Sequence, residues 1–277
     1  MPNERRTANG SFILEKNFFS FENAYYEFAH GMDYKDAMVF NYPPHIHDHY
    51  EIYVKLSGDI SFMVNSVMYA IEDCDAVISC PGDVHNAIVH KDCTHDHYCL
   101  WFSSSALAEF FAEKNIRGVI RLSEEKKKQL KRLLVGLEDE TNKLLITLDI
   151  LRIITLLAEG EEVEELAMPE KLRNILKYID ENLVTVKDSQ EIAENFSISV
   201  STLNRLFTRN LHTTVHTLIE KKRLSYAKHL LDAGIRATDA CFGAGFHDFS
   251  RFISKFKKEF GMTPAKYRGA NQKQDCV

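Results

Sequence analysis

Residues 188–210 read DSQEIAENFSISVSTLNRLFTRN, and residues 238–261 read TDACFGAGFHDFSRFISKFKKEFG. Both stretches follow one plan: a short helix, a tight turn and a second helix with basic residues. Aligning Phe207 with Phe256 sets the two copies 49 residues apart. Two such units in one small domain can place their second helices in successive major grooves of DNA, about 34 Å apart. An all-helical bundle with solvated basic residues is the alternative for either unit alone. The repeat therefore predicts an all-α DNA-binding domain.

The charge of the chain is divided unevenly along its length. The 277 residues have a formal net charge of −6, which is unusual for a protein that binds a polyanion. From Pro169 onward, however, there are 18 Lys and Arg residues against 12 Asp and Glu, whereas the preceding part has 16 against 28. This asymmetry indicates a polyanion-binding module joined to a module of another purpose.

The cysteine pattern and the chain start predict a cytoplasmic protein with reduced thiols. The start, MPNERRTANG, is polar and no apolar run approaches the length of a membrane span. No CxxC pair or zinc-knuckle spacing occurs among Cys74, Cys80, Cys93, Cys99, Cys241 and Cys276. A redox-sensing role would need a thiol of lowered pKa beside a partner.

The part before the repeat changes from strand-like to helix-like periodicity. Residues 12–103 contain short runs of near-alternating apolar residues, separated by turn formers such as Ser57-Gly58-Asp59. This pattern predicts an antiparallel barrel or jelly roll. Apolar residues at helical spacing then predict helices over 124–140 and 143–158. The expected fold class is α+β: an N-terminal β-barrel, two following helices, and an all-α domain with two helix-turn-helix units.

The predicted helix over 143–158 is apolar around much of its circumference. Such a helix needs partners on two sides, so we expect one side on its own barrel and the other on a second copy in a homodimer. Burial within one subunit is the alternative. The expected divisions are 1–122, an effector-binding barrel; 123–159, a helical pair for dimerisation; 160–169, a linker; 170–268, the DNA-binding domain; and 269–277, a tail.

The second helix of each unit has a polar face opposite its apolar residues. Asparagine pairs with adenine, arginine with guanine or phosphate, and hydroxyls with either. We therefore predict that DNA is contacted by Ser201, Asn204, Arg205 and Arg209 of the first unit and by Ser250, Arg251, Ser254 and Lys255 of the second. Because short serines flank Arg251, we expect the first unit to carry more sequence discrimination and the second more phosphate anchoring.

Residues 188–268 resemble the DNA-binding domain of the AraC/XylS family of transcription regulators. The resemblance rests on Arg223, Ala227, Leu230-Leu231, Gly245-Phe246, Asp248, Ser250, Phe252, Phe256-Lys257-Lys258, Gly261-Met262-Thr263-Pro264 and Tyr267-Arg268. Ala240 and Cys241 depart from the family's usual Ile and Ala, and Phe242-Gly243 is unusual after them. The resemblance implies that residues 217–233 hold the two units at a fixed separation. It also implies transcription activation, with RNA polymerase as a further partner.

His45, His47, Glu51 and Gly58 match the HxHx₃Ex₆G form of the first cupin motif, and Pro81–His85 resembles the second. The resemblance implies a cupin-like sensor domain, and His45, His47, Glu51 and His85 fill its four metal-ligand positions. Imidazole and carboxylate ligands suit zinc, nickel, iron or manganese. The second motif is compressed, and Val89 stands where the motif has asparagine, so a barrel without a metal is the alternative.

The same interior can instead hold an organic effector. Tyr53 and Trp101 offer aromatic faces, and His45, His47 and His85 offer imidazoles that bind hydroxyls. Family habit implies a sugar or glycoside. His49, His95 and His97 are expected at the surface or rim.

The sequence therefore predicts a DNA-binding transcription regulator that is controlled by a small-molecule effector and is not an enzyme. The alternatives are a metal-binding cupin enzyme, or a metal or redox sensor, fused to a DNA-binding domain.

Overall fold

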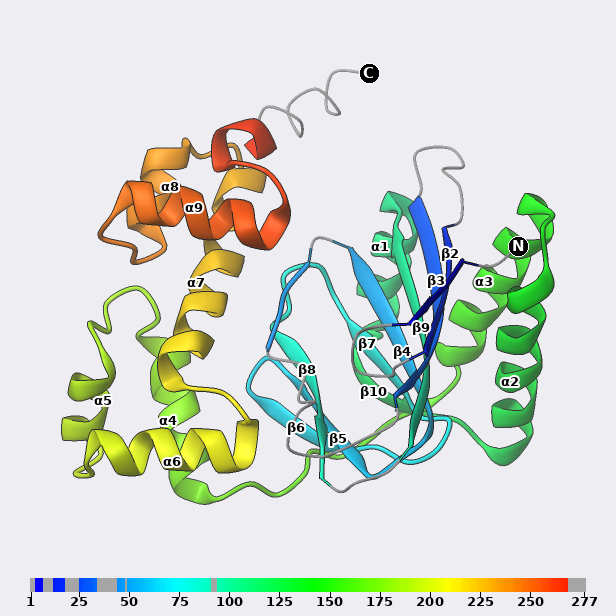
Figure 1. Cartoon of the computed structure of the whole chain (residues 1–277), viewed down its shortest axis with the longest axis horizontal. Helices are drawn as coiled ribbons and strands as arrows, with labels where there is room; N and C mark the ends of the chain where they lie inside the picture. The colour runs from blue at the N-terminus through cyan, green and yellow to red at the C-terminus, as the bar shows by residue number, and fades with distance from the viewer. Residues whose placement is uncertain are drawn as a thin grey trace.

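The computed structural model describes residues 3–6, 12–17, 25–33, 44–47, 49–90 and 94–268. A β-rich part is followed by two helices that cover it on one side, and a group of six helices lies on its other side (Figure 1). In the described part of the chain, no helix combines the length and apolar character needed to cross a bilayer.

Eight antiparallel strands form the larger sheet, in the order β1-β2-β3-β9-β4-β7-β10-β11. Their bounds are β1 (Asn3–Arg6), β2 (Phe12–Asn17), β3 (Tyr25–Asp33), β4 (Tyr50–Ser57), β7 (Ala76–Ser79), β9 (His95–Ser103), β10 (Gly118–Arg121) and β11 (Glu161–Glu162). The second sheet has the order β6-β5-β8, with β5 (Ile60–Val64), β6 (Val67–Ala70) and β8 (His85–Val89). The predicted α+β class is confirmed. The predicted barrel is not seen as one closed sheet, since the described strands form two sheets, an arrangement compatible with a cupin-like fold.

Side chains alternate between the two faces of the larger sheet, as the period of two in a strand requires. On β4, Ile52 and Val54 face the core shared with the helices α1 (Ser105–Lys114), α2 (Glu124–Asp139) and α3 (Lys143–Leu157). Tyr53, of opposite parity, packs with Phe62 of the second sheet in a separate interior core. The two predicted helices therefore cover one face of the sheet, and the candidate ligand residues lie on the other face.

The C-terminal part consists of α4 (Glu170–Glu181), α5 (Ser189–Asn195), α6 (Val200–Leu211), α7 (Val215–Asp232), α8 (Ala237–Gly243) and α9 (Phe249–Phe260). Helix starts are set by side-chain caps: Asp188 caps α5, Ser199 caps α6 and Asp248 caps α9. The predicted inward residues Phe207 and Phe256 are fully buried. Both predicted helix-turn-helix units are thus present, as α5–α6 and α8–α9.

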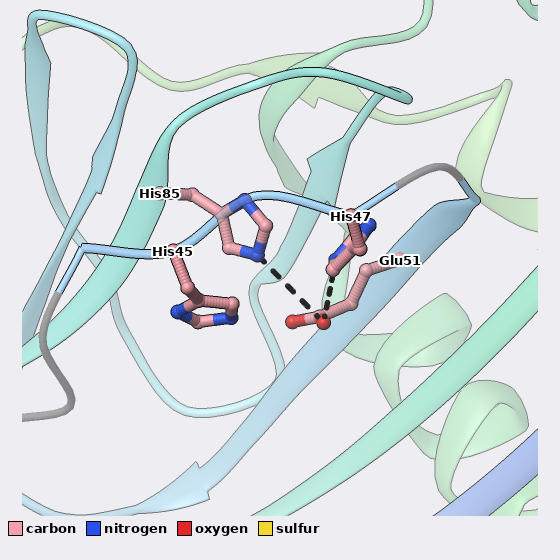
Figure 2. Close-up of side chains that lie close together, drawn as sticks. All are labelled: His45, His47, Glu51 and His85. Atoms are coloured by element: carbon pink, nitrogen blue, oxygen red, sulfur yellow. Dashed lines mark hydrogen bonds and ion pairs between the residues drawn. The ribbon is translucent and has the colours of Figure 1, made fainter. Parts of the chain in front are cut away.

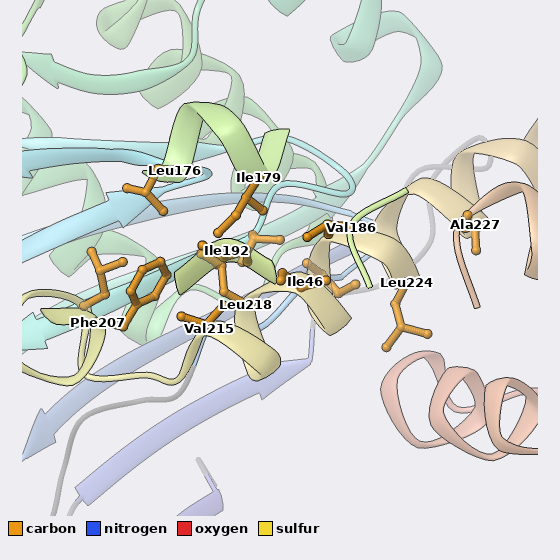
Figure 3. Close-up of a cluster of buried hydrophobic side chains, with 14 of the residues drawn as sticks. Ile46, Leu176, Ile179, Val186, Ile192, Phe207, Val215, Leu218, Leu224 and Ala227 are labelled. Carbon is orange, nitrogen blue, oxygen red and sulfur yellow. The ribbon is translucent and has the colours of Figure 1, made fainter. Parts of the chain in front are cut away.

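One apolar cluster continues from the helical part into the β-rich part (Figure 3). It joins Leu176 and Ile179 of α4 to Ile46, Met63 and Ile88 of the β-rich part. Along β5 and β8, the neighbours of Met63 and Ile88 face the interior between the two sheets. Met63 and Ile88 themselves therefore lie on the opposite face of the second sheet. The second sheet therefore lies between the candidate ligand residues and the helical part.

Candidate DNA interface and ligand site

The outward face of α6 carries the first set of predicted DNA contacts. Ser201, Arg205 and Arg209 are exposed, and Asn204 is half-buried. Leu203 and Phe207 are fully buried on the opposite face, so the polar side chains point away from the domain core. The predicted set is brought together on one exposed, basic surface of a single helix.

The corresponding face of α9 is more tightly tied to its own domain. Ser250, Arg251 and Ser254 are exposed, but the Lys255 ammonium forms an ion pair with Glu220 of α7. Burial, followed by the charge of Lys258, lowers the pKa of Lys255. Part of the positive charge predicted for DNA contact is therefore already balanced within the protein.

Arg223 of α7 fixes the two helix-turn-helix units relative to each other. Its Nε donates to the Leu183 carbonyl at 2.9 Å and its Nη2 to the Val186 carbonyl at 2.5 Å. Both carbonyls belong to the loop that leads into α5, and Gly245, in the turn between α8 and α9, packs against the same guanidinium. A buried side chain thus links the first unit, α7 and the second unit.

The candidate metal ligands converge inside the β-rich part (Figure 2). The ligand atoms of His45, His47, Glu51 and His85 all lie within 4.8 Å of one another. Glu51 Oε2 is 3.2 Å from His47 Nε2 and 3.8 Å from His85 Nε2. His45 is brought close by a β-bridge to His85. The four residues come from three segments of the chain, so this convergence is a property of the fold.

Backbone carbonyls orient two of the imidazoles toward Glu51. His85 Nδ1 lies 2.9 Å from the Asp83 carbonyl and His47 Nδ1 lies 2.8 Å from the His49 carbonyl. A carbonyl only accepts, so each Nδ1 carries a proton, and in a neutral ring Nε2 then presents its lone pair. His85 is fully buried, and its Nε2 has no hydrogen-bond partner among the described residues. Lone pairs facing a carboxylate form a donor set that fits a divalent cation.

The electrostatics of this cluster are dominated by burial and by the carboxylate. Burial raises the pKa of Glu51, but the imidazoles of His47 and His85 outweigh it and hold the pKa well below its usual value. Burial lowers the pKa of His85, but Glu51 outweighs it and the net shift is upward. For His47, burial prevails and lowers the pKa. Without a metal, the negative Glu51 carboxylate is therefore stabilised when the His47 and His85 rings donate to it from Nε2, whereas in the neutral rings the same atoms offer lone pairs to a cation.

The aromatic residues predicted to bind an effector lie beside this cluster. Trp101 Nε1 donates to Glu51 Oε2 at 2.5 Å. Tyr53 hydrogen-bonds His95 and stacks on His97 with ring centroids 5.1 Å apart. His95 is 1% exposed, so its predicted surface position is wrong.

His95, whose burial was not expected, alternates along β9 in step with Trp101. His95, His97, Cys99 and Trp101 have one parity along β9, which gives the signal that the sequence pattern contained. His49 is half-buried, with its ring stacked 4.0 Å from that of His47.

The loop before β8 connects this cluster to the helical part. The Gly82 carbonyl accepts a hydrogen bond from Ser225 Oγ of α7. Ser66 Oγ, in the turn between β5 and β6, donates to Asp180 Oδ2 of α4 at 2.9 Å. His85 follows Gly82 by three residues, so this short loop joins the ligand cluster to a hydrogen bond with α7.

Comparisons with known proteins match the two parts separately. Residues 33–154 match the family model of the AraC-like ligand-binding domain, and residues 192–270 match that of a helix-turn-helix domain. The HTH-type transcriptional activator RhaR of Mannheimia succiniciproducens is 23% identical over 240 residues, covering 82% of this chain and 87% of the relative. The HTH-type transcriptional activator RhaS of Escherichia fergusonii is 27% identical over 113 residues, covering 40% of this chain and 39% of the relative.

The chain thus spans less than half of the length of the RhaS relative that it matches. Among solved structures, ToxT from Vibrio cholerae O395 is 12% identical over 94% of this chain and 96% of its own, with a TM-score of 0.39. The resemblance found in the sequence is confirmed by the two family models, which together account for both the β-rich part and the helical repeat. The chain belongs to the AraC/XylS family of transcription regulators, with an AraC-like ligand-binding domain ahead of its helix-turn-helix domain.

Proposed function

We propose that this protein activates transcription by binding a specific DNA sequence through α6 and α9, under the control of a small molecule bound in its β-rich part. The observation that carries the proposal is the pair of exposed polar faces, Ser201 to Arg209 on α6 and Ser250 to Ser254 on α9, held together through Arg223. Exposed arginines on two helices of fixed separation suit two successive major grooves. Activation follows the names of the relatives, and RNA polymerase is the partner that it requires.

The effector that we propose is a sugar in the interior between the two sheets. The proposed binding site is formed by three imidazoles, the Glu51 carboxylate and the Trp101 indole, which lie close together. Such groups bind hydroxyls by hydrogen bonds and sugar rings by apolar contact. An effector there would act on DNA binding by favouring one arrangement of the Pro81–His85 loop against α7. No catalytic step is part of this proposal.

The protein would act as a homodimer through α3. Leu144, Leu148 and Leu151 repeat at helical spacing and are 60, 40 and 37% exposed, whereas Ile150, Ile153 and Ile154 on the other side are buried against the sheet. An apolar stripe on an exposed helix suits a matching stripe on a second copy.

In vitro selection with untagged, full-length protein tests the main proposal. A random duplex library should yield one two-part sequence, and footprinting should show protection of two adjacent major grooves on one side of the duplex. A panel of monosaccharides is then added to the binding assay. One class should change the affinity, and that change should be lost in Trp101→Ala. Selection of no sequence, or turnover of a sugar by the protein, would contradict the proposal.

The buried donor set also supports a second candidate function, a metal-dependent sensor. His45, His47, Glu51 and His85 would hold the cation, which would supply a charged anchor for an oxygen of the effector. Metal analysis of untagged protein, followed by DNA-binding assays with and without the metal, distinguishes this candidate from a metal-free sugar sensor.

A further inference from the structure

A cavity of about 290 Å³ lies between the two helix-turn-helix units. One wall is the loop from Lys187 to Ser189 at the start of α5. The others are the first half of α7, from His216 to Arg223, and the segment from Gly245 through Lys255 of α9. We call this cavity the central cleft. It belongs neither to the outward face of α6 nor to the interior of the β-rich part.

The acidic side chains of the central cleft are already engaged. Asp188 Oδ1 accepts from the backbone N–H groups of Gln190 and Glu191, at 2.9 and 3.0 Å, as the cap of α5. Asp248 Oδ1 caps α9 by accepting from the Arg251 N–H at 2.9 Å. Glu220 forms the ion pair with Lys255. Two of these carboxylates therefore cap helices, and the third forms an ion pair with a lysine.

Three basic side chains of the cleft form no ion pair with a carboxylate of the described residues. Lys187, His247 and Arg251 are exposed, and within the described part of the chain no carboxylate forms an ion pair with them. His216 lies 4.0 Å from Glu220, with a side chain that is 70% exposed. Burial, followed by the positive charges of Lys255 and Arg251, lowers the pKa of His216. Around the cleft, the four charged basic residues Lys187, Arg223, Arg251 and Lys255 outnumber the three acidic residues Asp188, Glu220 and Asp248, so the cleft suits an anion.

We propose that the central cleft binds the DNA backbone phosphates that pass between the two major grooves contacted by α6 and α9. This inference rests on the proposed function, and it adds a contact region in which Lys187 and His247 join Arg251 of the α9 contact set. Two successive major grooves on one side of a duplex are separated by a minor groove, whose phosphates face the protein midway between the two helices. A site at that position fixes the register of both helices without reading a base.

Arg223 gives this contact region its rigidity. Its hydrogen bonds to the Leu183 and Val186 carbonyls hold the α5 loop against α7, and Gly245 brings the α9 segment to the same place. The basic side chains of the cleft therefore lie on three segments that cannot separate without breaking the Arg223 contacts. A phosphate in the cleft would bind to both helix-turn-helix units at once.

The test uses full-length protein and a duplex selected from random sequence by the wild type. Single neutral methylphosphonates replace each backbone phosphate between the two protected grooves in turn. For the wild type, replacement at the central phosphates should weaken binding by roughly 3- to 10-fold. Lys187→Ala should weaken binding of the unmodified duplex by a similar factor, with no further loss on the modified duplex. For Lys187→Ala, the slope of log affinity against log salt concentration should be smaller in magnitude by about 0.9 than for the wild type.

Lys128→Ala on α2 is the matched control, since it removes the same charge from an exposed lysine far along the chain. It should leave affinity and slope unchanged. Thermal unfolding checks that each variant folds, and Lys187→Gln replaces Lys187→Ala where it does not. If Lys187→Ala and His247→Ala keep the wild-type affinity and slope while Arg205→Ala loses binding, the central cleft is refuted and the proposed function stands. If the wild type selects no duplex, both are refuted.

Discussion

Gly245 lies directly against the guanidinium of Arg223: a Cβ atom added at position 245 would come within 2.9 Å of Arg223 Nε and 2.6 Å of the Val184 carbonyl oxygen. Its φ of +85° is also one that side chains rarely adopt. Position 245 therefore requires a glycine for two reasons: its backbone conformation disfavours other residues, and a Cβ atom has no room there. This contact joins the second helix-turn-helix unit to the loop of the first, so its geometry sets the separation of α6 and α9.

Gly245→Ala should destabilise the helical part by about 3 kcal/mol or more, the sum of left-handed backbone strain and overpacking. Gly234→Ala is a matched control, because Gly234 has a φ of +81° but nothing within 4 Å of an added Cβ. It should cost only about 1–2 kcal/mol, from backbone strain. Urea denaturation followed by circular dichroism measures both. Equal losses for the two variants would show that the Arg223 contact has no packing role.

The two helix-turn-helix units should differ in what their arginines contribute. Arg205→Ala should cost about 1–3 kcal/mol on the selected duplex and relax the preference at one base pair, as expected for an arginine that binds guanine. Arg251→Ala should weaken binding to all duplexes alike, because Arg251 lies at the central cleft. Binding titrations against single-base variants of the duplex measure the difference. Retention of wild-type affinity by both variants would contradict the assignment of α6 and α9 to DNA.

The helical part could be predicted almost completely from the sequence because its signals are local. Caps such as Ser199 and apolar spacing such as Leu203 and Phe207 lie within one or two turns of each other. The ion pair between Lys255 and Glu220 was not predicted, because it joins residues 35 apart on different helices. Local periodicity identifies the exposed face of a helix but not the neighbour that shares it.

The β-rich part was less predictable because strand pairing is not local. β3 pairs with β9, more than 60 residues later, and β10 pairs with β7. Short apolar runs do not specify these partners, and the apolar pattern indicated neither α1 nor β10. The ligand cluster was found through its motif spacing, whereas His95 was missed since its burial depends on which strands flank β9.

Leu148→Glu should convert a dimer into a monomer at micromolar concentration, because it places a charge in the centre of the proposed α3 stripe. Leu166→Glu is the matched control: Leu166 is also 40% exposed, but it lies outside α3. Sedimentation velocity measures the mass of both variants and of the wild type. A Leu148→Glu variant that keeps the mass of a dimer would show that the subunits contact each other elsewhere. A monomeric wild type would contradict the proposed homodimer.

Cys80 and Cys241 should react slowly, contrary to the redox-sensor alternative. Burial, followed by the charge of Asp83, raises the pKa of Cys80 to about 11, and burial also raises that of Cys241 to about 11. Since the thiolate is the reactive form, on the order of one thiol in 1,000 is ionised at pH 8, and reactivity should rise with pH toward 11. Alkylation of a Cys93→Ser/Cys276→Ser variant, which removes the two cysteines outside the described residues, measures this rate. Alkylation of Cys80 at pH 7 as fast as in the unfolded chain would restore the redox alternative.

A divalent cation should stabilise the wild type if the His45, His47, Glu51 and His85 cluster is a metal site. A ligand that binds only the folded state adds about 2.7 kcal/mol at 100 times its Kd, so the unfolding temperature should rise with metal concentration. After treatment with a chelator, the protein is titrated with Zn²⁺, Ni²⁺, Fe²⁺ or Mn²⁺. His85→Ala should abolish the rise because it removes a buried ligand. His90→Ala should not, because the His90 imidazole lies against Ser61, outside the cluster. An equal rise in His85→Ala would assign the stabilising metal to another part of the chain, and no rise in the wild type would leave Glu51 as a hydrogen-bonding anchor for a sugar.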